Sequence, residues 1–375
     1  MKQIFKEKLD IIDSLYPAER VQKSKKRFDM IWNGSIPNDR YPFAFAPMLY
    51  LPYDDVHSAE QRVEATLNDL ISRGVFTDDT VPSVFPGCLQ TTLPNMLGAP
   101  ETGEGSDRVV ERIVQCPEDV TKLKIFTGKG TVIYEWLEAE RKILDLTDGR
   151  LPVHICDMQG PFDASAQLCG YDSLILMAYE APESYDNLMS LMCEAFCICW
   201  EEQKKIIGKN FIGSHLFSWD YMPQMDCASM SIDSLAMVSP DFFCEFVVPY
   251  MKKISERLGK LVIHSCGDFG HNIKALMEED IVIGINASQM TVEQMMEKGL
   301  TNDKVVIIAT DGNVIADSIK TCRENKMLAS LSAYGPYPLG SDGATWIHSD
   351  NWTQKDREFA MELNQKLLDA ATVKK

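Results

Sequence analysis

The feature that most constrains how this chain folds is a series of eight short apolar runs, separated by segments with the spacing of amphipathic helices. Runs such as LVIHS, IVIGIN and VVIIAT are continuous rather than alternating, which is typical of parallel strands buried on both faces. Strands that alternate with helices predict an α/β protein, and eight of them predict a (β/α)8 TIM barrel. An open doubly wound sheet is less favoured, because no Gly-rich loop of the dinucleotide-binding pattern follows any run. The expected strands are residues 42–48, 81–85, 152–157, 211–217, 261–265, 281–286, 305–310 and 328–333.

The segments between these runs predict the helices of the barrel, and a final helix closes the chain. The amino terminus, MKQIFKEKLDIIDSLYPAERVQKSKK, predicts a helix followed by a basic turn and is too charged for a signal peptide. We therefore expect residues 1–375 to form a single barrel domain, with residues 1–40 as an N-terminal helical extension. The expected helices are residues 59–73, 134–146, 182–209, 240–258, 292–298, 314–324 and 354–371.

The charge and composition narrow the classes of partner. The chain has 375 residues, a formal net charge of −18 and 45% hydrophobic residues, so it can bury a large core but repels phosphate backbones. No apolar stretch approaches the roughly 18 residues of a membrane span. The 11 cysteines show no regular framework, which favours a reducing compartment. We expect a cytoplasmic protein that binds neither nucleic acid nor membrane; whether it forms a homodimer is left open.

The catalytic mouth of a (β/α)8 barrel lies at the carboxyl ends of its strands. Polar and aromatic residues recur at these positions in the chain. Three carboxylates are candidate catalytic residues, namely Asp157, Asp220 and Asp311. The candidate substrate contacts are the nearby polar and aromatic residues Gln159, Trp219, Tyr221, Asn286 and Tyr334.

The sharpest local signal is VIHSCGDFGHNI, in which an apolar strand ends in His264-Ser265-Cys266-Gly267. Side chains two residues apart on a strand face the same way, so His264 and Cys266 can point together into the mouth. Imidazole and thiolate are a good pair of ligands for zinc. The sequence therefore predicts a metal site here, against the alternative of a structural histidine and an inert cysteine.

A second His-x-Cys pattern, His154-Ile155-Cys156, lies earlier in its own expected strand. Its position favours a hydrogen-bonded histidine inside the barrel, with Asp157 and Gln159 nearer to the mouth.

Several segments, in order, resemble the uroporphyrinogen decarboxylase superfamily. VIHSCGDFGHNIKAL resembles its HSCG segment, MVSPDFFCEFVVPYMKKISERLGK resembles the helix that leads into that strand, and DMQGPFDASAQLCGYDSLILMAYEAPESYDNLMSLM resembles an earlier segment that begins with Gly-Pro-Phe. The resemblance covers about the last 60% of the chain, from residue 152 onward. It implies a TIM barrel with the active site around His264 and Cys266.

The resemblance divides into branches. True uroporphyrinogen decarboxylases hold an acidic tetrapyrrole with an R-Q-A-G-R-Y-like segment. This chain lacks that segment, and its comparable region reads RFDMIWNGSIPNDRYPFAF. The methyltransferases that work with coenzyme M bind zinc through His-x-Cys and a later cysteine at the last strand, where this chain has LSAY and no thiol. Cys322, the next cysteine after Cys266, falls in an expected helix about three turns from its strand. A third ligand is left among Cys227, Asp220, Asp157 and Asp311.

The branch that suits the chain best comprises corrinoid-dependent demethylating methyltransferases. It implies a Zn²⁺ cofactor held by His264 and Cys266, a small methylated donor such as a methyl ether, and a partner corrinoid protein whose cobalt accepts the methyl group. A metal-free decarboxylase or lyase, and a non-catalytic binding protein on the same barrel, are the alternative functions.

Overall fold

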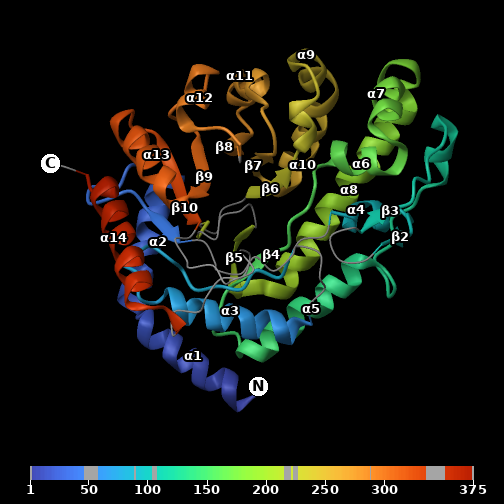
Figure 1. The fold of residues 1–375 in the computed structure, drawn as a ribbon. Coiled ribbons are helices and arrows are strands. Elements are labelled where there is room, and N and C mark those ends of the chain that lie inside the picture. The colour runs from blue at the N-terminus through green and yellow to red at the C-terminus, as the bar shows by residue number, and fades with distance from the viewer. Residues whose placement is uncertain are drawn as a thin grey trace.

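The computed structural model describes residues 2–45, 58–87, 90–103, 108–214, 221–222, 227–287, 289–334 and 351–373. Within them, strands occupy the centre of the molecule and helices surround them (Figure 1). The central strands are β1 (Phe43–Phe45), β4 (Val153–Ile155), β5 (Phe211–Ser214), β6 (Cys227–Ser231), β7 (Lys260–Ser265), β8 (Val282–Ala287), β9 (Val305–Asp311) and β10 (Leu328–Tyr334). A separate small hairpin pairs β2 (Glu101–Thr102) with β3 (Val109–Val110).

The central strands curve into a ring. Six of them form a parallel sheet in the order β1-β10-β9-β8-β7-β6, and β4 pairs in parallel with β5. Parallel bridges join Val84 to β4 and Gln159, just beyond β4, to Ser231 at the end of β6. The backbone N–H of Asp79 donates to Phe43 of β1, so that the segment 79–84 lies between β1 and β4. The predicted TIM barrel is therefore confirmed.

Seven of the eight expected strands are present, and the eighth, at residues 81–85, is reduced to the bridge at Val84. β6 was not expected from the sequence. Its residues, CASMS, are small and weakly apolar, yet all of them are buried because β6 pairs with β7 and its end pairs with Gln159. The strand prediction failed here because burial came from tertiary pairing rather than from side-chain hydrophobicity.

Each expected helix is present, and α3 (Ala59–Arg73) and α14 (Gln354–Ala371) have the predicted bounds. The basic turn expected after the first helix is wrong, because residues 21–26 lie inside a second helix, α2 (Ala18–Trp32). The expected helix 240–258 is interrupted by a π-helical turn, η5 (Phe243–Val247), because Pro249 lacks an N–H and its ring displaces the preceding turn. The helices are α1 (Gln3–Leu15), α2 (Ala18–Trp32), α3 (Ala59–Arg73), α4 (Thr92–Met96), η2 (Pro117–Lys122), α5 (Val132–Thr147), α6 (Pro161–Cys169), α7 (Tyr171–Glu180), α8 (Pro182–Ile207), η3 (Gly208–Asn210), η4 (Asp233–Ala236), α9 (Pro240–Phe242), α10 (Val248–Leu258), α11 (Gly270–Glu278), α12 (Val292–Glu297), α13 (Gly312–Glu324) and α14.

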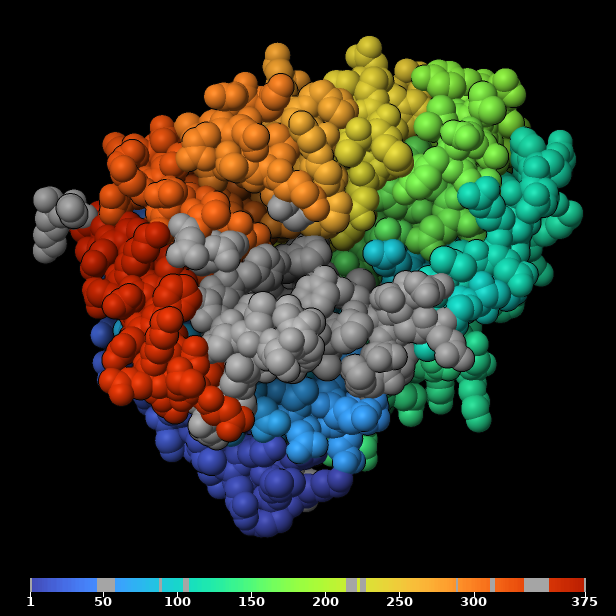
Figure 2. All heavy atoms as spheres, in the orientation of Figure 1, coloured from blue at the N-terminus to red at the C-terminus, as the bar shows by residue number. Residues whose placement is uncertain are grey.

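The carboxyl-terminal segment lies against the chain that leads into β1. Arg40, just before β1, bridges to Thr372, just after α14 (Gln354–Ala371), and Val373 donates its N–H to Asp39. In the space-filling view, α14 lies in red beside the blue N-terminal helices (Figure 2). None of the helices in the described ranges has the length and apolarity required to cross a membrane.

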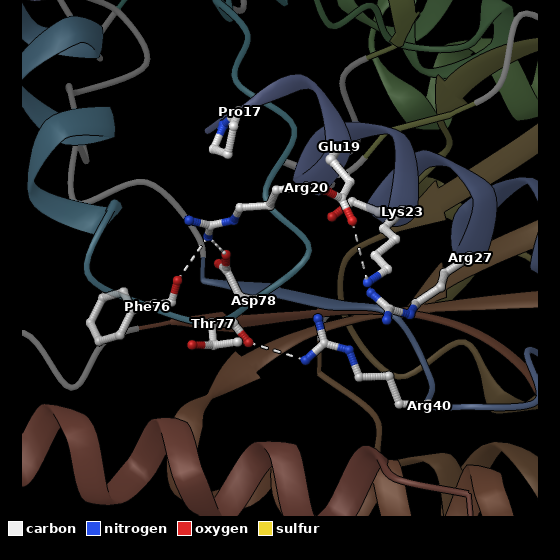
Figure 3. Close-up of a pocket in the computed structure, with 10 residues that line it drawn as sticks. Pro17, Glu19, Arg20, Lys23, Arg27, Arg40, Phe76, Thr77 and Asp78 are labelled. Carbon is white, nitrogen blue, oxygen red and sulfur yellow. Dashed lines mark hydrogen bonds and ion pairs between the residues drawn. The ribbon is translucent and has the colours of Figure 1, made fainter. Parts of the chain in front are cut away.

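A cavity of about 500 Å³ opens at the amino-terminal end of the barrel, between α2 and residues 76–78 (Figure 3). Buried carboxylates satisfy the arginines around it. Asp78 lies 2.9 Å from Arg20, and Asp79 lies 2.6 Å from Arg27 and 3.0 Å from Arg40. Because these cations are already neutralised, the cluster acts as an anchor that holds α2 against the barrel rather than as a site for an anion.

Glu140, on α5, is a buried carboxyl group without a hydrogen-bond partner in the part of the chain that the structure describes. Its side chain is fully buried, and neither oxygen has a hydrogen-bond partner among the residues described. Burial raises the pKa of Glu140 well above its usual range, and the charge of Arg141 lowers it only in part. Folding therefore favours the protonated form of Glu140. Its contribution to the free energy of unfolding is fully present below pH about 4, which is its pKa in the unfolded chain. The contribution is lost as the pH rises through the pKa of the folded state.

We expect Glu140→Met to stabilise the protein by about 1–3 kcal/mol at pH 8, because an unbranched apolar side chain removes the desolvation cost. The gain should shrink at pH 5, and urea unfolding at the two pH values measures it. Glu138→Met, on the exposed face of the same helix, is the control and should change stability little at either pH. A gain that did not depend on pH would show that the ionisation of Glu140 is not its cause.

Candidate metal centre

His264 and Cys266 come from the carboxyl end of β7, where the expected zinc pair lies. The imidazole is 2% exposed and Cys266 is half-buried, with His264 Nε2 lying 3.3 Å from Cys266 Sγ. The spacing of two residues turns both side chains to the same side of the strand. The pair predicted from the sequence is thus brought into direct contact.

Asn286, on the adjacent strand β8, determines which nitrogen of His264 faces Cys266. Its Nδ2 donates to the carbonyl of Ile307 at 2.9 Å, so its Oδ1 faces His264 Nδ1 at 2.5 Å. An acceptor at that position requires the proton on Nδ1, which leaves the lone pair of Nε2 directed toward Cys266. The histidine is held in the tautomer that binds a metal through Nε2.

Asp233 supplies a third ligand atom. It begins η4, immediately beyond β6, and its Oδ1 accepts the backbone N–H of Cys266 at 2.8 Å and lies 3.7 Å from His264 Nε2. One ligand atom from each of Asp233, His264 and Cys266 falls within 4.8 Å of the other two. Parallel pairing of β6 with β7 sets Ser231 opposite His264, which carries Asp233 to the level of Cys266.

Asp233 was not among the predicted ligands, because it follows β6, the strand that was not expected from the sequence. Of the alternatives considered for the third ligand, Cys227 lies opposite Lys260, at the amino-terminal start of β7 and so at the wrong end of the barrel. Asp220 lies outside the described residues, as does the side chain of Asp311. Cys322 is buried in α13, as expected, and burial raises the pKa of its thiol to about 12.

Two further hydrogen bonds hold the backbone of this centre in place. Gln289 accepts the backbone N–H of Gly267, which follows Cys266 in a left-handed turn at φ 78° that suits glycine. Asp163, on α6, accepts the backbone N–H of Asp233 at 2.5 Å. Burial raises the pKa of Asp163 to about 7, although its hydrogen bond with Ser234 lowers it.

Asp157 and Gln159 lie at the same carboxyl-terminal rim of the barrel as the metal centre, on the other side of β6 from His264. The hydroxyl of Ser231 lies 3.4 Å from Asp157 Oδ1, and Gln159 is bridged to Ser231 and accepts a hydrogen bond from Gln167. These two predicted site residues are therefore brought near the metal centre by β6.

Tyr221 lies elsewhere. Lys25 of α2 lies 5.1 Å from the centre of its ring, and burial near Asp29 raises its pKa to about 12. These two contacts set the Tyr221 ring against α2, and its contact with a substrate stays a prediction. Trp219 lies outside the described residues, as does the side chain of Tyr334, and for them and for Asn286 contact with a substrate stays a prediction.

The second His-x-Cys pattern is buried within the barrel wall. His154 Nε2 lies 2.9 Å from the hydroxyl of Ser83, and the backbone N–H of Cys156 donates to Gln203. Both residues are about 2% exposed. These contacts agree with the expectation of a structural histidine at this position.

The donor set matches the chemistry of zinc. One imidazole nitrogen, one thiolate and one carboxylate oxygen are ligands that Zn²⁺ prefers, and catalytic zinc sites use three protein ligands with one position left open. Asp233 is 31% exposed, so the third ligand faces the solvent side of the mouth. The three residues therefore fit a zinc ion of the catalytic kind.

We expect Asp233→Ala to weaken zinc binding at least about 100-fold, since even partners outside the ligand shell contribute 10–100-fold. Competition with a chromophoric chelator measures the change. Asp268→Ala is the matched control, because Asp268 is an exposed carboxylate two residues beyond Cys266 whose side chain accepts only the N–H of Gly270, at 2.9 Å, among the hydrogen bonds described. Equal losses in the two variants would rule out Asp233 as a ligand.

Comparison with solved structures relates this fold to a known protein. The chain aligns with a methyltransferase from Methanosarcina mazei with a TM-score of 0.61 and 14% sequence identity, over 92% of this chain and 97% of the other. The chain has a methyltransferase-type barrel fold. At 14% identity this likeness concerns the fold alone.

The other comparisons add little. A B12-independent methionine synthase from Shewanella aligns over 62% of this chain and 65% of its own, with 9% identity and a TM-score of 0.36, too low to support an argument. No protein-family model and no curated protein matches the sequence.

Proposed function

We propose that this protein is a zinc-dependent methyltransferase, the demethylase component that moves a methyl group from a small methylated donor, such as a methyl ether, to the cobalt of a partner corrinoid protein. The observation that carries the proposal is the Asp233–His264–Cys266 cluster at the carboxyl ends of β6 and β7. The methyltransferase-type fold supports it.

His264 Nε2, Cys266 Sγ and Asp233 Oδ would hold the zinc ion. When bound, zinc acts as a Lewis acid that polarises the heteroatom from which the methyl group leaves. A set with one thiolate donates less electron density than a set with two, so it favours polarisation of an ether oxygen over activation of a thiol. This chemistry suits an oxygen-linked methyl donor.

Asp157 and Gln159, at the rim of the barrel, would act on the methylated donor itself. The leaving oxygen must gain a proton from the solvent when its methyl group departs, and we assign the relay of this proton to Asp157, whose carboxylate faces Ser231 on the strand next to His264. Gln159, on the same rim, would orient the donor. The methyl group then passes to the reduced cobalt of the corrinoid protein, which is the acceptor substrate of the reaction.

The test combines metal analysis with methyl transfer. The protein is purified gently, its zinc content is measured, and it is mixed with a corrinoid protein reduced to Co(I) and with a panel of methyl ethers, methylamines and methanol. We expect about one zinc per chain and methylation of the cobalt with an ether donor. Absence of zinc, or methylation no faster than without the protein while a carboxylated substrate is turned over, would replace the proposal with the metal-free lyase.

A further inference from the structure

Asp163 is a fully buried carboxyl group whose hydrogen bonds converge on the candidate metal centre. It lies in the first turn of α6 and has no exposed surface. Its Oδ2 accepts the backbone N–H of Asp233 at 2.5 Å, and its Oδ1 accepts the N–H of Ser234 at 3.2 Å and the hydroxyl of Tyr171 at 3.1 Å. Two of its three donors therefore belong to the backbone of η4, the element that carries Asp233.

The backbone around these contacts is closely packed. The N–H of Gly160, at the start of α6, donates to the carbonyl of Ser231 at 2.6 Å. A Cβ atom on Gly160 would lie 3.1 Å from the side chain of Ile232 and 3.2 Å from the Ser231 carbonyl, so the approach suits glycine. The start of α6 is thus pressed against the chain that leads from β6 into Asp233.

Asp233 is consequently held at two points. Asp163 binds its backbone N–H, and the N–H of Cys266 binds its side-chain oxygen. A metal ligand that follows a strand on a single short turn, as in η4, has few contacts of its own to restrain it. The buried carboxyl group supplies the missing restraint from a different element of the barrel.

We propose that Asp163 is a positioning residue that fixes Asp233 as a ligand of the metal, an inference that rests on the proposed zinc site. It touches neither metal nor substrate. By restricting Asp233 before the ion binds, Asp163 reduces the conformational entropy that Asp233 loses on binding. Partners outside the ligand shell raise metal affinity by about 10–100-fold in this way.

The experiment is a double-mutant cycle on zinc affinity, measured by chelator competition with the full-length protein. Asp163→Ala is expected to weaken zinc binding by about 10–100-fold when Asp233 is present. In the Asp233→Ala background the same change is expected to have less than about a 2-fold effect, because the residue it positions is gone. Thermal unfolding of each variant records any loss of fold separately.

Two variants separate positioning from general structure. Asp163→Asn keeps an oxygen that can accept the N–H groups of both Asp233 and Ser234, as Oδ2 does at 2.5 and 3.4 Å, and it can donate its NH₂ to Tyr171, so it is expected to keep the affinity within about 3-fold of the wild type. Tyr171→Phe removes the third donor but leaves both η4 contacts, so it is expected to change zinc affinity less than about 2-fold.

The outcomes are distinct. If the wild-type protein binds no zinc, the proposed function and this inference fall together. If it binds zinc and Asp163→Ala matches the wild type, or weakens binding equally with and without Asp233, the zinc site stands and the positioning role is overturned. If Asp163→Ala does not fold, the Asn variant decides: affinity near that of the wild type supports the role, and a loss equal to that of Asp233→Ala contradicts it.

Discussion

His264→Ala should abolish stoichiometric zinc binding and reduce methyl transfer by about 10³-fold or more. Loss of the Nε2 ligand removes an ion whose Lewis acidity contributes several kcal/mol to the reaction, at 1.36 kcal/mol for each factor of ten. The barrel should stay folded. The change costs about 1–3 kcal/mol, since it leaves Asn286 without its partner in a buried position. Elemental analysis, the rate of cobalt methylation and far-UV circular dichroism measure the three effects.

His271 provides the control for this variant. It lies on α11, seven residues beyond His264, and its Nε2 is 2.9 Å from the carbonyl of Val238. His271→Ala should therefore cost some stability but keep zinc and activity. If His264→Ala retained a full complement of zinc, the metal site would have to lie elsewhere in the chain.

Asp79→Ala should destabilise the protein by about 3–5 kcal/mol, the cost of removing one partner from a buried ion pair. The Asp79 side chain is fully buried and lies against two arginines, Arg27 at 2.6 Å and Arg40 at 3.0 Å. It also accepts hydrogen bonds from the hydroxyl of Ser24 and the N–H of Phe43, which ties α2 to β1. Urea unfolding followed by tryptophan fluorescence measures the loss.

The control is Asp39→Ala, which removes a second carboxylate from the same arginine. Asp39 lies 2.6 Å from Arg27, but its side chain is 62% exposed, so the loss should stay below about 1 kcal/mol. Burial, and not the number of ion pairs, explains the contrast. Comparable losses in the two variants would contradict the view that Asp79 anchors α2.

The candidate site was only half predictable from the sequence. His264 and Cys266 could be found because they end one apolar run and their spacing alone turns them together. Asp233 could not be found, because its position as a third ligand depends on the pairing of β6 with β7. β6 is made of small residues and has no hydrophobic pattern that would predict a strand. Asp163, about 70 residues earlier, reaches the same point only because α6 packs against the end of β6.

Tyr221 gained a neighbour that the sequence did not indicate. It follows an expected strand closely in sequence, which favoured a place at the mouth. The structure sets its ring 5.1 Å from Lys25 of α2, an element distant in the chain. Its contact with a substrate stays a prediction.

By itself, the sequence determined the barrel, most of its strands and the His264–Cys266 pair, because hydrophobic periodicity and the alternation of side chains along a strand are local properties. The tertiary structure decided the rest: the third ligand, the tautomer of His264 imposed by Asn286, and the bracing of Asp233. Each of these depends on which strands are neighbours and in what register. Neighbouring parallel strands are joined by long crossover connections and can lie far apart in sequence, so a local pattern does not reveal which strands pair.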